Sequence, residues 1–383
     1  MIIERTIQNR IEEIILKPSD KKKAIVIYGA RQVGKTTLIK EIQKKLPQLV
    51  SEYYNCDLLN IQNLFSYKNA ANLGSIVQNI DLLILDEAQR IPEIGMVIKI
   101  LVDTYPSLQI ITTGSSSFEL SGKINEPLTG RKIVFQLFPL SFGEYNSGKN
   151  YLEKNLSFEQ IMRFGSYPSL LGKSEKDLIQ ELDELCSSYL FKDILSFQNL
   201  RKPELLHNLL KLLAFQIGNE VSYTELAGRT GVDTSVIQKY IHLLEESFII
   251  FRLPAFKRNL RSEISKSRKI YFWDLGIRNS LIQNYNSFDF RDDAGALWEN
   301  FCIVERIKYL KNNGINFNSY FWRTHEQKEI DYIEEKNGQF NAFEIKWSQN
   351  RKVKFPVLFM ETYPNSVYKQ INQENFINEF LTD

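Results

Sequence analysis

A glycine-rich run near the start of the chain carries residue types that bind phosphate. Gly29 and Gly34 flank four residues, and Lys35 and Thr36 follow, which matches the pattern G-x-x-x-x-G-K-[ST]. In this pattern glycines let backbone N–H groups turn inward around phosphates, lysine supplies a positive charge, and the hydroxyl binds Mg²⁺. A helix beginning there aims its positive end at the same anion. We therefore predict a site for ATP with Mg²⁺, formed by Gly29, Ala30, Arg31, Gln32, Val33, Gly34, Lys35, Thr36 and Thr37.

A second polar group follows the apolar run Leu82–Leu85. Asp86 ends this run, where a carboxylate can reach the metal ion, and Glu87 is placed to orient and deprotonate the attacking water. Thr112 and Thr113 close the next predicted strand and Ser115 follows it; Thr113 and Ser115 are equal candidates to touch the γ-phosphate or the water. Asp86 and Glu87 would also fit an ordinary solvated helix start, but the glycine-rich run upstream favours the catalytic interpretation.

The developing charge on a transferred phosphoryl group needs a further cation. Arg131 is the first candidate, acting within one chain or from a neighbouring subunit of a homo-oligomer. Arg31 is the second candidate. Both also fit as surface arginines.

Continuous apolar runs separated by helical segments are typical of a parallel sheet that is covered on both faces. The sequence predicts helices over 35–45 and 94–102 and strands over 24–28, 49–55, 80–85, 109–113 and 133–137.

Four motifs, in this order, resemble prokaryotic AAA-type P-loop ATPases that carry a C-terminal domain of unknown function. They are Gly29–Thr37, Leu85–Gln89, Thr113–Ser116 and Pro139–Tyr145. The resemblance implies an α/β fold with an AAA-like P-loop domain, a winged helix and a nuclease-like tail. We expect an AAA-like P-loop parallel-sheet domain in residues 1–145 and a helical lid or linker in 146–200. A winged-helix domain in 201–285 and an α/β restriction-endonuclease-like domain in 286–383 would follow.

The middle of the chain predicts three short helices and two strands. The helices cover Glu204–Gln216, Tyr223–Arg229 and Thr234–Ser247, and the strands cover Phe248–Phe251 and Ile270–Phe272. This order fits a helix-turn-helix followed by a wing.

The loop that joins the two strands is the chain's one compositional anomaly. From Lys257 to Lys269 it holds six basic residues against one acidic residue, Glu263. Such a charge can neutralise several phosphates, so we predict contact with DNA. A protein-interaction module and an ordinary solvated loop remain alternatives. The basic residues are Lys257, Arg258, Arg261, Lys266, Arg268 and Lys269.

The residues from 286 to the end, the tail, suggest a second site. Asp331 precedes Glu344 by thirteen residues, enough for a hairpin that brings the carboxylates together, and Lys346 shares a strand face with Glu344. The acids would hold Mg²⁺ and the lysine would steer water in phosphodiester cleavage. This layout resembles restriction-endonuclease-like nucleases, in which Glu299 matches the helical acid. A half-exposed charged strand and a degenerate fold without cleavage remain alternatives.

Composition limits the class of protein. The 383 residues include 43% apolar residues, and the net charge is +2, which indicates a globular chain of two or three domains with only local basic surfaces. The three cysteines lie far apart, so a zinc site or a disulfide framework is not expected. The start is charged, and no apolar run approaches the roughly eighteen residues that span a bilayer. We expect a soluble, cytoplasmic protein.

Two functions remain open from the sequence. The first is an ATP-driven enzyme that acts on DNA through the winged helix and the nuclease-like tail. The second is a molecular switch, in which ATP controls protein assembly, the tail is catalytically dead and no nucleic acid is bound.

Overall fold

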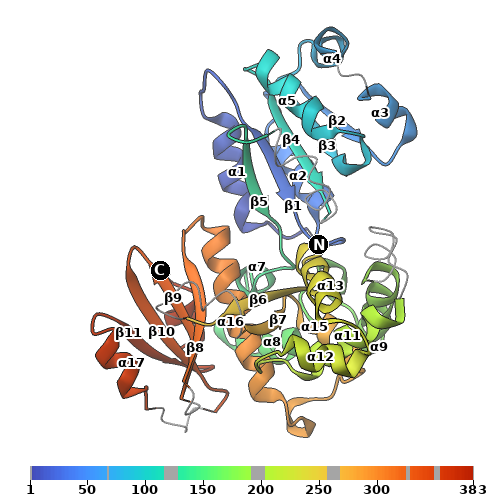
Figure 1. Ribbon diagram of the computed structural model, residues 1–383. Helices are drawn as coiled ribbons and strands as arrows, with labels where there is room; N and C mark the ends of the chain where they lie inside the picture. The colour runs from blue at the N-terminus through green and yellow to red at the C-terminus, as the bar shows by residue number, and fades with distance from the viewer. Residues whose placement is uncertain are drawn as a thin grey trace. The chain divides into compact units, whose positions relative to one another are not determined.

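The structure is a computed structural model that describes residues 2–66, 69–115, 128–190, 203–256, 268–324, 328–348 and 354–382. The chain forms two compact units (Figure 1). Unit 1 comprises Met1–Leu140 with Glu246–Phe248, and unit 2 comprises Ser141–Glu245 with Ile249–Asp383. The finer division at residues 145, 200 and 285 stays a prediction.

Unit 1 is built on a five-stranded sheet with the order β2-β3-β4-β1-β5, in which all neighbours are parallel. The central strands β1, β3 and β4 are buried throughout, as their continuous apolar sequences require. All five strands lie where the sequence predicts them, although β2 and β3 begin two residues later. The strands are β1 (Ala24–Tyr28), β2 (Ser51–Asn55), β3 (Leu82–Asp86), β4 (Gln109–Gly114) and β5 (Lys132–Gln136).

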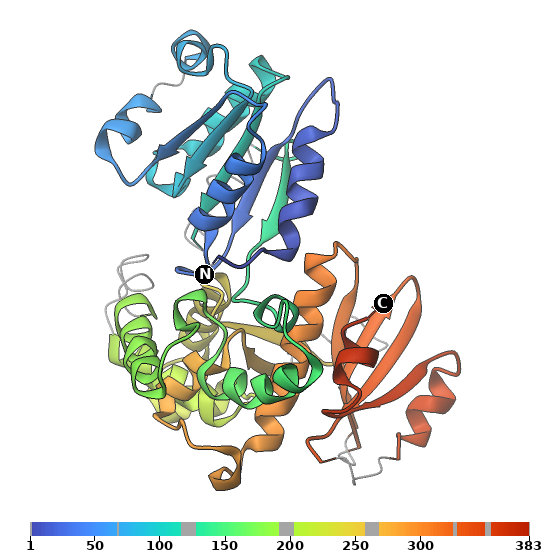
Figure 2. The same ribbon diagram turned by 180° about the vertical axis from the view of Figure 1, so that it is seen from behind.

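Helices cover both faces of this sheet. In Figure 1 helix α5 lies in front of the strands, whereas Figure 2, from behind, shows α1 and α2 in front of them. Side chains alternate between faces along a strand, so every second residue of β1 meets each layer of helices. The helices are α1 (Thr6–Leu16), α2 (Lys35–Lys45), α3 (Leu59–Leu64), α4 (Ala70–Val77), the short turn η1 (Ala88–Arg90) and α5 (Ile94–Thr104).

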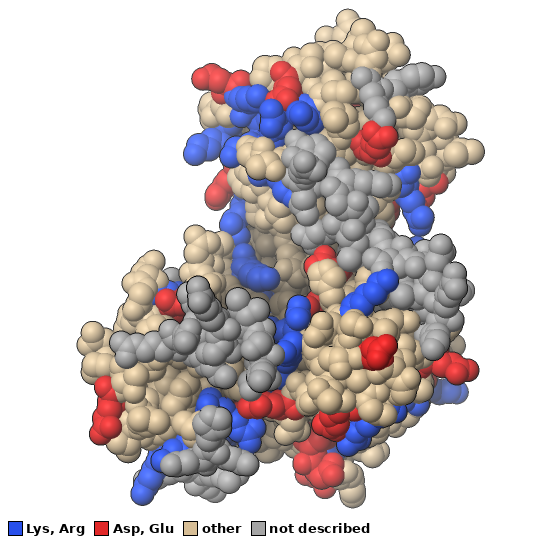
Figure 3. Space-filling model, in the orientation of Figure 1, with Lys and Arg blue, Asp and Glu red and all other residues tan. Residues whose placement is uncertain are grey.

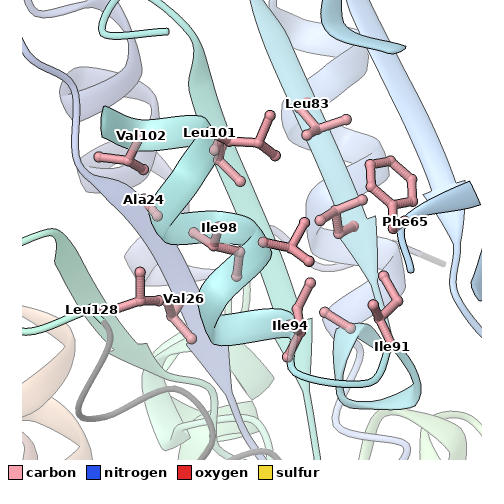
Figure 4. Packing of buried hydrophobic residues seen from close by; sticks show 14 of the residues in the cluster. Ala24, Val26, Phe65, Leu83, Ile91, Ile94, Ile98, Leu101, Val102 and Leu128 are labelled. Carbon is pink, nitrogen blue, oxygen red and sulfur yellow. The ribbon is translucent and has the colours of Figure 1, made fainter. Parts of the chain in front are cut away.

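The core on the α5 face fixes the strand ends. Ile94, Ile98 and Leu101 of α5 lie against Val26 of β1 and Leu83 of β3 (Figure 4), and all five are buried. Burying one such side chain stabilises the fold by about 1.5–3 kcal/mol. This packing therefore holds the carboxyl ends of β1, β3 and β4 in fixed positions.

Unit 2 begins with helices whose starts are capped. Ser141 and Glu144 form a reciprocal capping box at α7, and Asn150 and Glu153 form another at α8. In the segment predicted as a helical lid or linker, helix α9 ends at Glu184, a π-helical turn follows to Leu190, and residues 191–202 lie outside the described residues. The first elements are α7 (Phe142–Tyr145), α8 (Tyr151–Phe164), η2 (Pro168–Leu170), α9 (Glu175–Glu184) and η3 (Leu185–Leu190).

The middle of unit 2 has the predicted order of three helices and two strands. Strands β6 and β7 pair antiparallel. That these elements form a winged helix remains a prediction. The elements are α11 (Pro203–Phe215), α12 (Tyr223–Thr230), α13 (Thr234–Glu246), β6 (Ile250–Pro254), β7 (Arg268–Phe272), α15 (Leu275–Ile282) and η4 (Phe288–Phe290).

The tail holds a second sheet with the order β11-β10-β9-β8. Strands β8, β9 and β10 are antiparallel neighbours, and β10 pairs parallel with β11. Helix α16 contacts both β7 and β10 and is buried along most of its length, so it connects the two sheets of unit 2. The elements are α16 (Ala294–Asn312), β8 (Asn318–Arg323), β9 (Glu329–Lys336), β10 (Gln339–Ile345), α17 (Val357–Thr362), β11 (Val367–Ile371) and η5 (Phe376–Phe380). Among the described residues, no helix combines the length and apolarity needed to cross a membrane.

Candidate nucleotide site and carboxylate cluster

The glycine-rich loop connects β1 to α2 and has a geometry that requires its glycines. Gly34 has a φ of 97°, in the left-handed region that favours glycine. At Gly29, an added Cβ would lie 2.3 Å from the Leu137 carbonyl oxygen, so the close approach of two backbones excludes a side chain. Gly34 provides no side-chain cap for α2, and the amides of the first turn remain suited to an anion.

Two basic side chains hold this loop. The Lys35 ammonium donates to the carbonyl oxygens of Gly29 and Ala30, both at 3.0 Å. The Arg5 guanidinium, which is buried, donates to the Val33 carbonyl at 2.8 Å and to the Phe138 carbonyl at 2.6 Å. Arg5 thus ties the loop to the segment after β5. The sequence pattern did not identify it, because no motif distinguishes this arginine from a surface residue.

Asp86 is the centre of a buried hydrogen-bond network at the carboxyl edge of the sheet. Its Oδ2 accepts from the Thr36 hydroxyl at 2.7 Å and from the Tyr53 hydroxyl at 2.8 Å, and its Oδ1 accepts from the Thr113 hydroxyl. The donors come from α2, β2 and β4, while Asp86 ends β3. Thr36, Asp86 and Thr113 are all predicted from the sequence motifs, and the fold brings the three together.

Tyr53 is a residue of this network that the sequence reasoning missed. Burial and its hydrogen bond to Asp86 raise the pKa of the Tyr53 hydroxyl, which therefore remains a donor. The only signal in the sequence is the position of this tyrosine near the end of a strand that neighbours β3.

Glu87 follows Asp86 with a φ of 54°, an uncommon conformation for a residue with a side chain. Its N–H donates to the Thr113 hydroxyl at 3.0 Å, and its Oε2 accepts from the Gln89 amide at 2.5 Å. The same amide donates to the Ser115 hydroxyl at 3.2 Å. Thr113 thus fixes Asp86 and Glu87, whereas Ser115 acts through Gln89, a second residue that the sequence reasoning did not identify.

Arg131 does not belong to this site within one chain. Its carbonyl oxygen accepts from the Ala24 N–H at 2.9 Å, at the amino end of β1, whereas the glycine-rich loop follows the carboxyl end of β1. Its guanidinium forms an ion pair with Asp103 at 2.9 Å, and this pair holds the pKa of Asp103 below its usual range. The prediction that Arg131 acts within the same chain is wrong; a role from a neighbouring subunit stays a prediction. Arg31 is exposed on the loop.

The donor set at Asp86 fits Mg²⁺. In phosphate sites this ion is held by one or two protein oxygens, with phosphates and waters completing the shell. The Thr36 hydroxyl and the Asp86 carboxylate converge within 2.7 Å, next to the loop suited to phosphates. These two residues would hold the ion.

A second polar centre lies in unit 2 and is called here the carboxylate cluster: Glu299, Glu329, Asp331 and Glu344. The β9–β10 hairpin pairs Tyr332 with Phe343, which sets Asp331 opposite Glu344 as the sequence predicts. Asp331 also accepts from the Ile345 N–H at 2.8 Å.

Two lysines lie inside this cluster. The Lys346 ammonium is 3.0 Å from Asp331 Oδ2 and 2.9 Å from Glu344 Oε2. The Lys269 ammonium is 3.0 Å from Glu299 Oε1 and 2.5 Å from Glu329 Oε1. Each lysine thus joins two carboxylates.

Burial shapes the acidity of the cluster. Burial and the nearby Asp331 raise the pKa of Glu344 to about 7. Burial also raises the pKa of Glu299, against the opposing attraction of Lys269 and the hydrogen bond from the Tyr271 hydroxyl at 2.6 Å. The lysines therefore do not fully offset the cost of burying these acids.

The predicted Mg²⁺ site at Asp331 and Glu344 does not fit this arrangement. Ammonium groups stand between the carboxylates where a metal ion would have to lie. No group of three or more metal-binding side chains with suitable placement occurs in the described part of the chain. We therefore derive no metal-dependent step at the carboxylate cluster.

The predicted DNA surface is only partly described. Lys257, Arg258, Arg261 and Lys266 lie outside the described residues. Lys269 is 2% exposed and ion-paired, so the prediction that it contacts DNA is wrong.

The Arg268 guanidinium lies 3.9 Å from the centroid of the Tyr223 ring, and its contact with DNA stays a prediction. On the face of unit 2 drawn in Figure 3, outside the grey atoms, basic side chains lie among acidic ones and form no continuous basic surface.

Comparisons with known proteins support the nucleotide site. Residues 21–146 match the family model described as "AAA domain", which supports an AAA-type P-loop ATPase. Residues 155–287 match "Domain of unknown function (DUF8612)", and residues 294–378 match "Domain of unknown function (DUF4143)".

Three similar chains are uncharacterized proteins. One from Mycobacterium tuberculosis is 26% identical over 326 residues, which are 84% of this chain and 70% of the relative. One from Methanocaldococcus jannaschii is 27% identical over 350 residues, or 85% and 74%. One from Haemophilus influenzae is 24% identical over 362 residues, or 88% and 86%. The similarity therefore extends over most of both chains.

Proposed function

We propose that the chain binds ATP with Mg²⁺ and hydrolyses the bond to the γ-phosphate. One observation carries this proposal: the Thr36 hydroxyl in the first turn of α2 and the Asp86 carboxylate at the end of β3, fifty residues apart, meet at 2.7 Å beside the glycine-rich loop. The match of residues 21–146 to an AAA domain supports it.

Binding of the triphosphate follows from the loop. Backbone N–H groups and the start of α2 supply positive potential to the phosphates. In this structure the Lys35 ammonium donates to the loop's own carbonyls. When ATP binds, this ammonium would donate to the β- and γ-phosphates instead. When bound, Mg²⁺ supplies charge stabilisation at the phosphate oxygens.

Glu87 is the proposed general base. The attacking water forms a bond from its oxygen to the γ-phosphorus, its proton passes to the Glu87 carboxylate, and ADP leaves with the bridging oxygen. Thr113 fixes the Glu87 backbone and Asp86, and so sets the direction of the base. The Gln89 amide holds Glu87 in this structure and would have to release the carboxylate oxygen before proton transfer.

The test compares hydrolysis and binding in one variant. Glu87→Gln should keep ATP affinity within about threefold while its turnover falls by roughly 10²–10⁴, because a positioned base contributes that range. Turnover equal to that of the parent would exclude Glu87 as the base.

For the target of this ATPase we propose an assembly switch in preference to action on DNA. Lys269, which is predicted from the sequence to contact DNA, is buried and forms ion pairs with Glu299 and Glu329. Helix α13, the last helix of the predicted helix-turn-helix, has one lysine against two glutamates. Neither feature attracts phosphates.

A comparison of turnover with and without single-stranded, double-stranded and branched DNA separates the two proposals. Unchanged turnover, with self-association or partner association that follows the bound nucleotide, supports the switch. Strong stimulation by any of these DNAs supports an enzyme that acts on nucleic acid.

A further inference from the structure

Lys269 is a buried cation whose carboxylate partners come from other elements. It lies on β7, at the end of the predicted basic loop, while Glu299 belongs to α16 and Glu329 to β9. Its ammonium is within 3.0 Å of both carboxylates and 5.6 Å from the centroid of the Phe321 ring. The position of this charge is therefore fixed from three sides.

Charge balance explains why such a lysine is stable. Taking an isolated ammonium group out of water costs several kcal/mol, and the opposite charges around it offset that cost. The Tyr271 hydroxyl donates to the oxygen of Glu299 that also faces Lys269, so this carboxylate oxygen accepts from two donors. Lys269 thus serves as an internal counter-ion of the cluster.

The same position cannot hold an ammonium group and a metal ion. Mg²⁺ needs oxygen ligands at about 2.0–2.1 Å. An ion that close to these carboxylates would be repelled by the positive charges of Lys269 and Lys346, which contact the same carboxylates. We propose that Lys269 occupies the cation position of the carboxylate cluster and keeps divalent ions out of it, so that removal of this charge opens the cluster to a divalent ion. This inference concerns unit 2 and does not rest on the proposed ATPase activity.

Titration of nucleotide-free full-length protein with Mn²⁺ tests the proposal, with Asp86→Asn as the common background so that Mn²⁺ cannot bind at the nucleotide site. In that background, calorimetry should show no Mn²⁺ binding. The protein that carries Lys269→Met in addition to Asp86→Asn should bind about one Mn²⁺ per chain. In EDTA its unfolding midpoint should fall by roughly 5–10 °C, because an uncompensated buried carboxylate pair remains. Saturating Mn²⁺ should recover at least half of that loss.

Two variants control for ordinary damage to the core. Lys269→Arg keeps the positive charge, so this variant should not bind Mn²⁺. Lys308→Met removes another buried lysine, 2.8 Å from Glu305 and outside the cluster, so it should lower the midpoint without recovery by Mn²⁺.

The proposal is overturned if the Lys269→Met variant does not bind Mn²⁺. It is also overturned if the background protein, with Lys269 intact, binds Mn²⁺ equally well and Glu299→Gln abolishes that binding. Should Lys269→Met be insoluble in EDTA, soluble yield restored by Mn²⁺ supports the proposal. Equal insolubility in both buffers overturns it.

Discussion

Tyr53→Phe is the substitution that best separates the geometry of the nucleotide site from its sequence motif. It removes one hydroxyl, which donates to Asp86 Oδ2 at 2.8 Å. Removal of a group that hydrogen-bonds to a metal-binding carboxylate typically lowers metal affinity by about 10–100-fold, because the carboxylate is no longer held in its orientation. If Mg²⁺ takes over the Thr36 hydroxyl, Tyr53 is the remaining donor on that oxygen. We therefore expect the apparent Mg²⁺ affinity in ATP hydrolysis to fall by about 10–100-fold.

The assay measures the Mg²⁺ dependence of turnover at saturating ATP, together with ATP binding in EDTA, which should stay unchanged. Tyr54→Phe is the matched control, because Tyr54 packs edge-on against Phe65 with ring centroids 5.2 Å apart. It should behave like the parent. An unchanged Mg²⁺ dependence in Tyr53→Phe, or equal losses in both variants, would refute the reasoning.

Three further predictions follow from single contacts. Gly29→Ala should weaken ATP binding at least tenfold in calorimetry, because its Cβ would meet a backbone carbonyl at 2.3 Å. Thr113→Val should lower turnover by about 10²-fold with ATP affinity within threefold, because it loses the contacts that orient both acids of the nucleotide site. Because the pKa of Glu344 is raised to about 7, the folded chain holds a proton that the unfolded chain releases above about pH 4.3. Stability in denaturant titrations should therefore fall by on the order of 1–3 kcal/mol as pH rises from 4.5 to 7, and Glu344→Gln should remove this fall.

Each of these predictions has a control in the chain. Gly228→Ala should leave ATP binding unchanged, because nothing lies within 4 Å of its added Cβ. Thr112→Val should leave turnover unchanged, because the buried Thr112 hydroxyl has no hydrogen-bond partner among the described residues. Loss of turnover in Thr112→Val equal to that in Thr113→Val would point to general damage. A pH dependence that persists in Glu344→Gln would remove Glu344 as its cause.

Local patterns in the sequence were sufficient to predict the five strands of unit 1 and its helices α2 and α5, but not α1, α3 and α4. Continuous apolar runs identify buried parallel strands, and the glycine spacing identifies the loop between β1 and α2. Parallel strands align their carboxyl ends, so Asp86 and Thr113 could be expected at the same edge as the loop. The same logic should have rejected Arg131, which precedes β5 and therefore lies at the opposite edge.

Residues whose role depends on contacts between distant segments could not be predicted. Arg5 and Tyr53 belong to no motif, and only the folded chain brings them to the Val33 carbonyl and to Asp86. Lys269 was misassigned because a basic residue in a basic loop suggests solvent exposure. The buried acids beside it come from residues thirty and sixty positions further along the chain.

Equilibrium binding of ATP tests the central claim most directly. Calorimetry with Mg²⁺ should show one ATP per chain, and Lys35→Ala should weaken that binding by at least two orders of magnitude while the protein keeps its unfolding midpoint. Absence of ATP binding by the parent chain, or equal affinity in Lys35→Ala, would contradict the assignment of this loop as a nucleotide site.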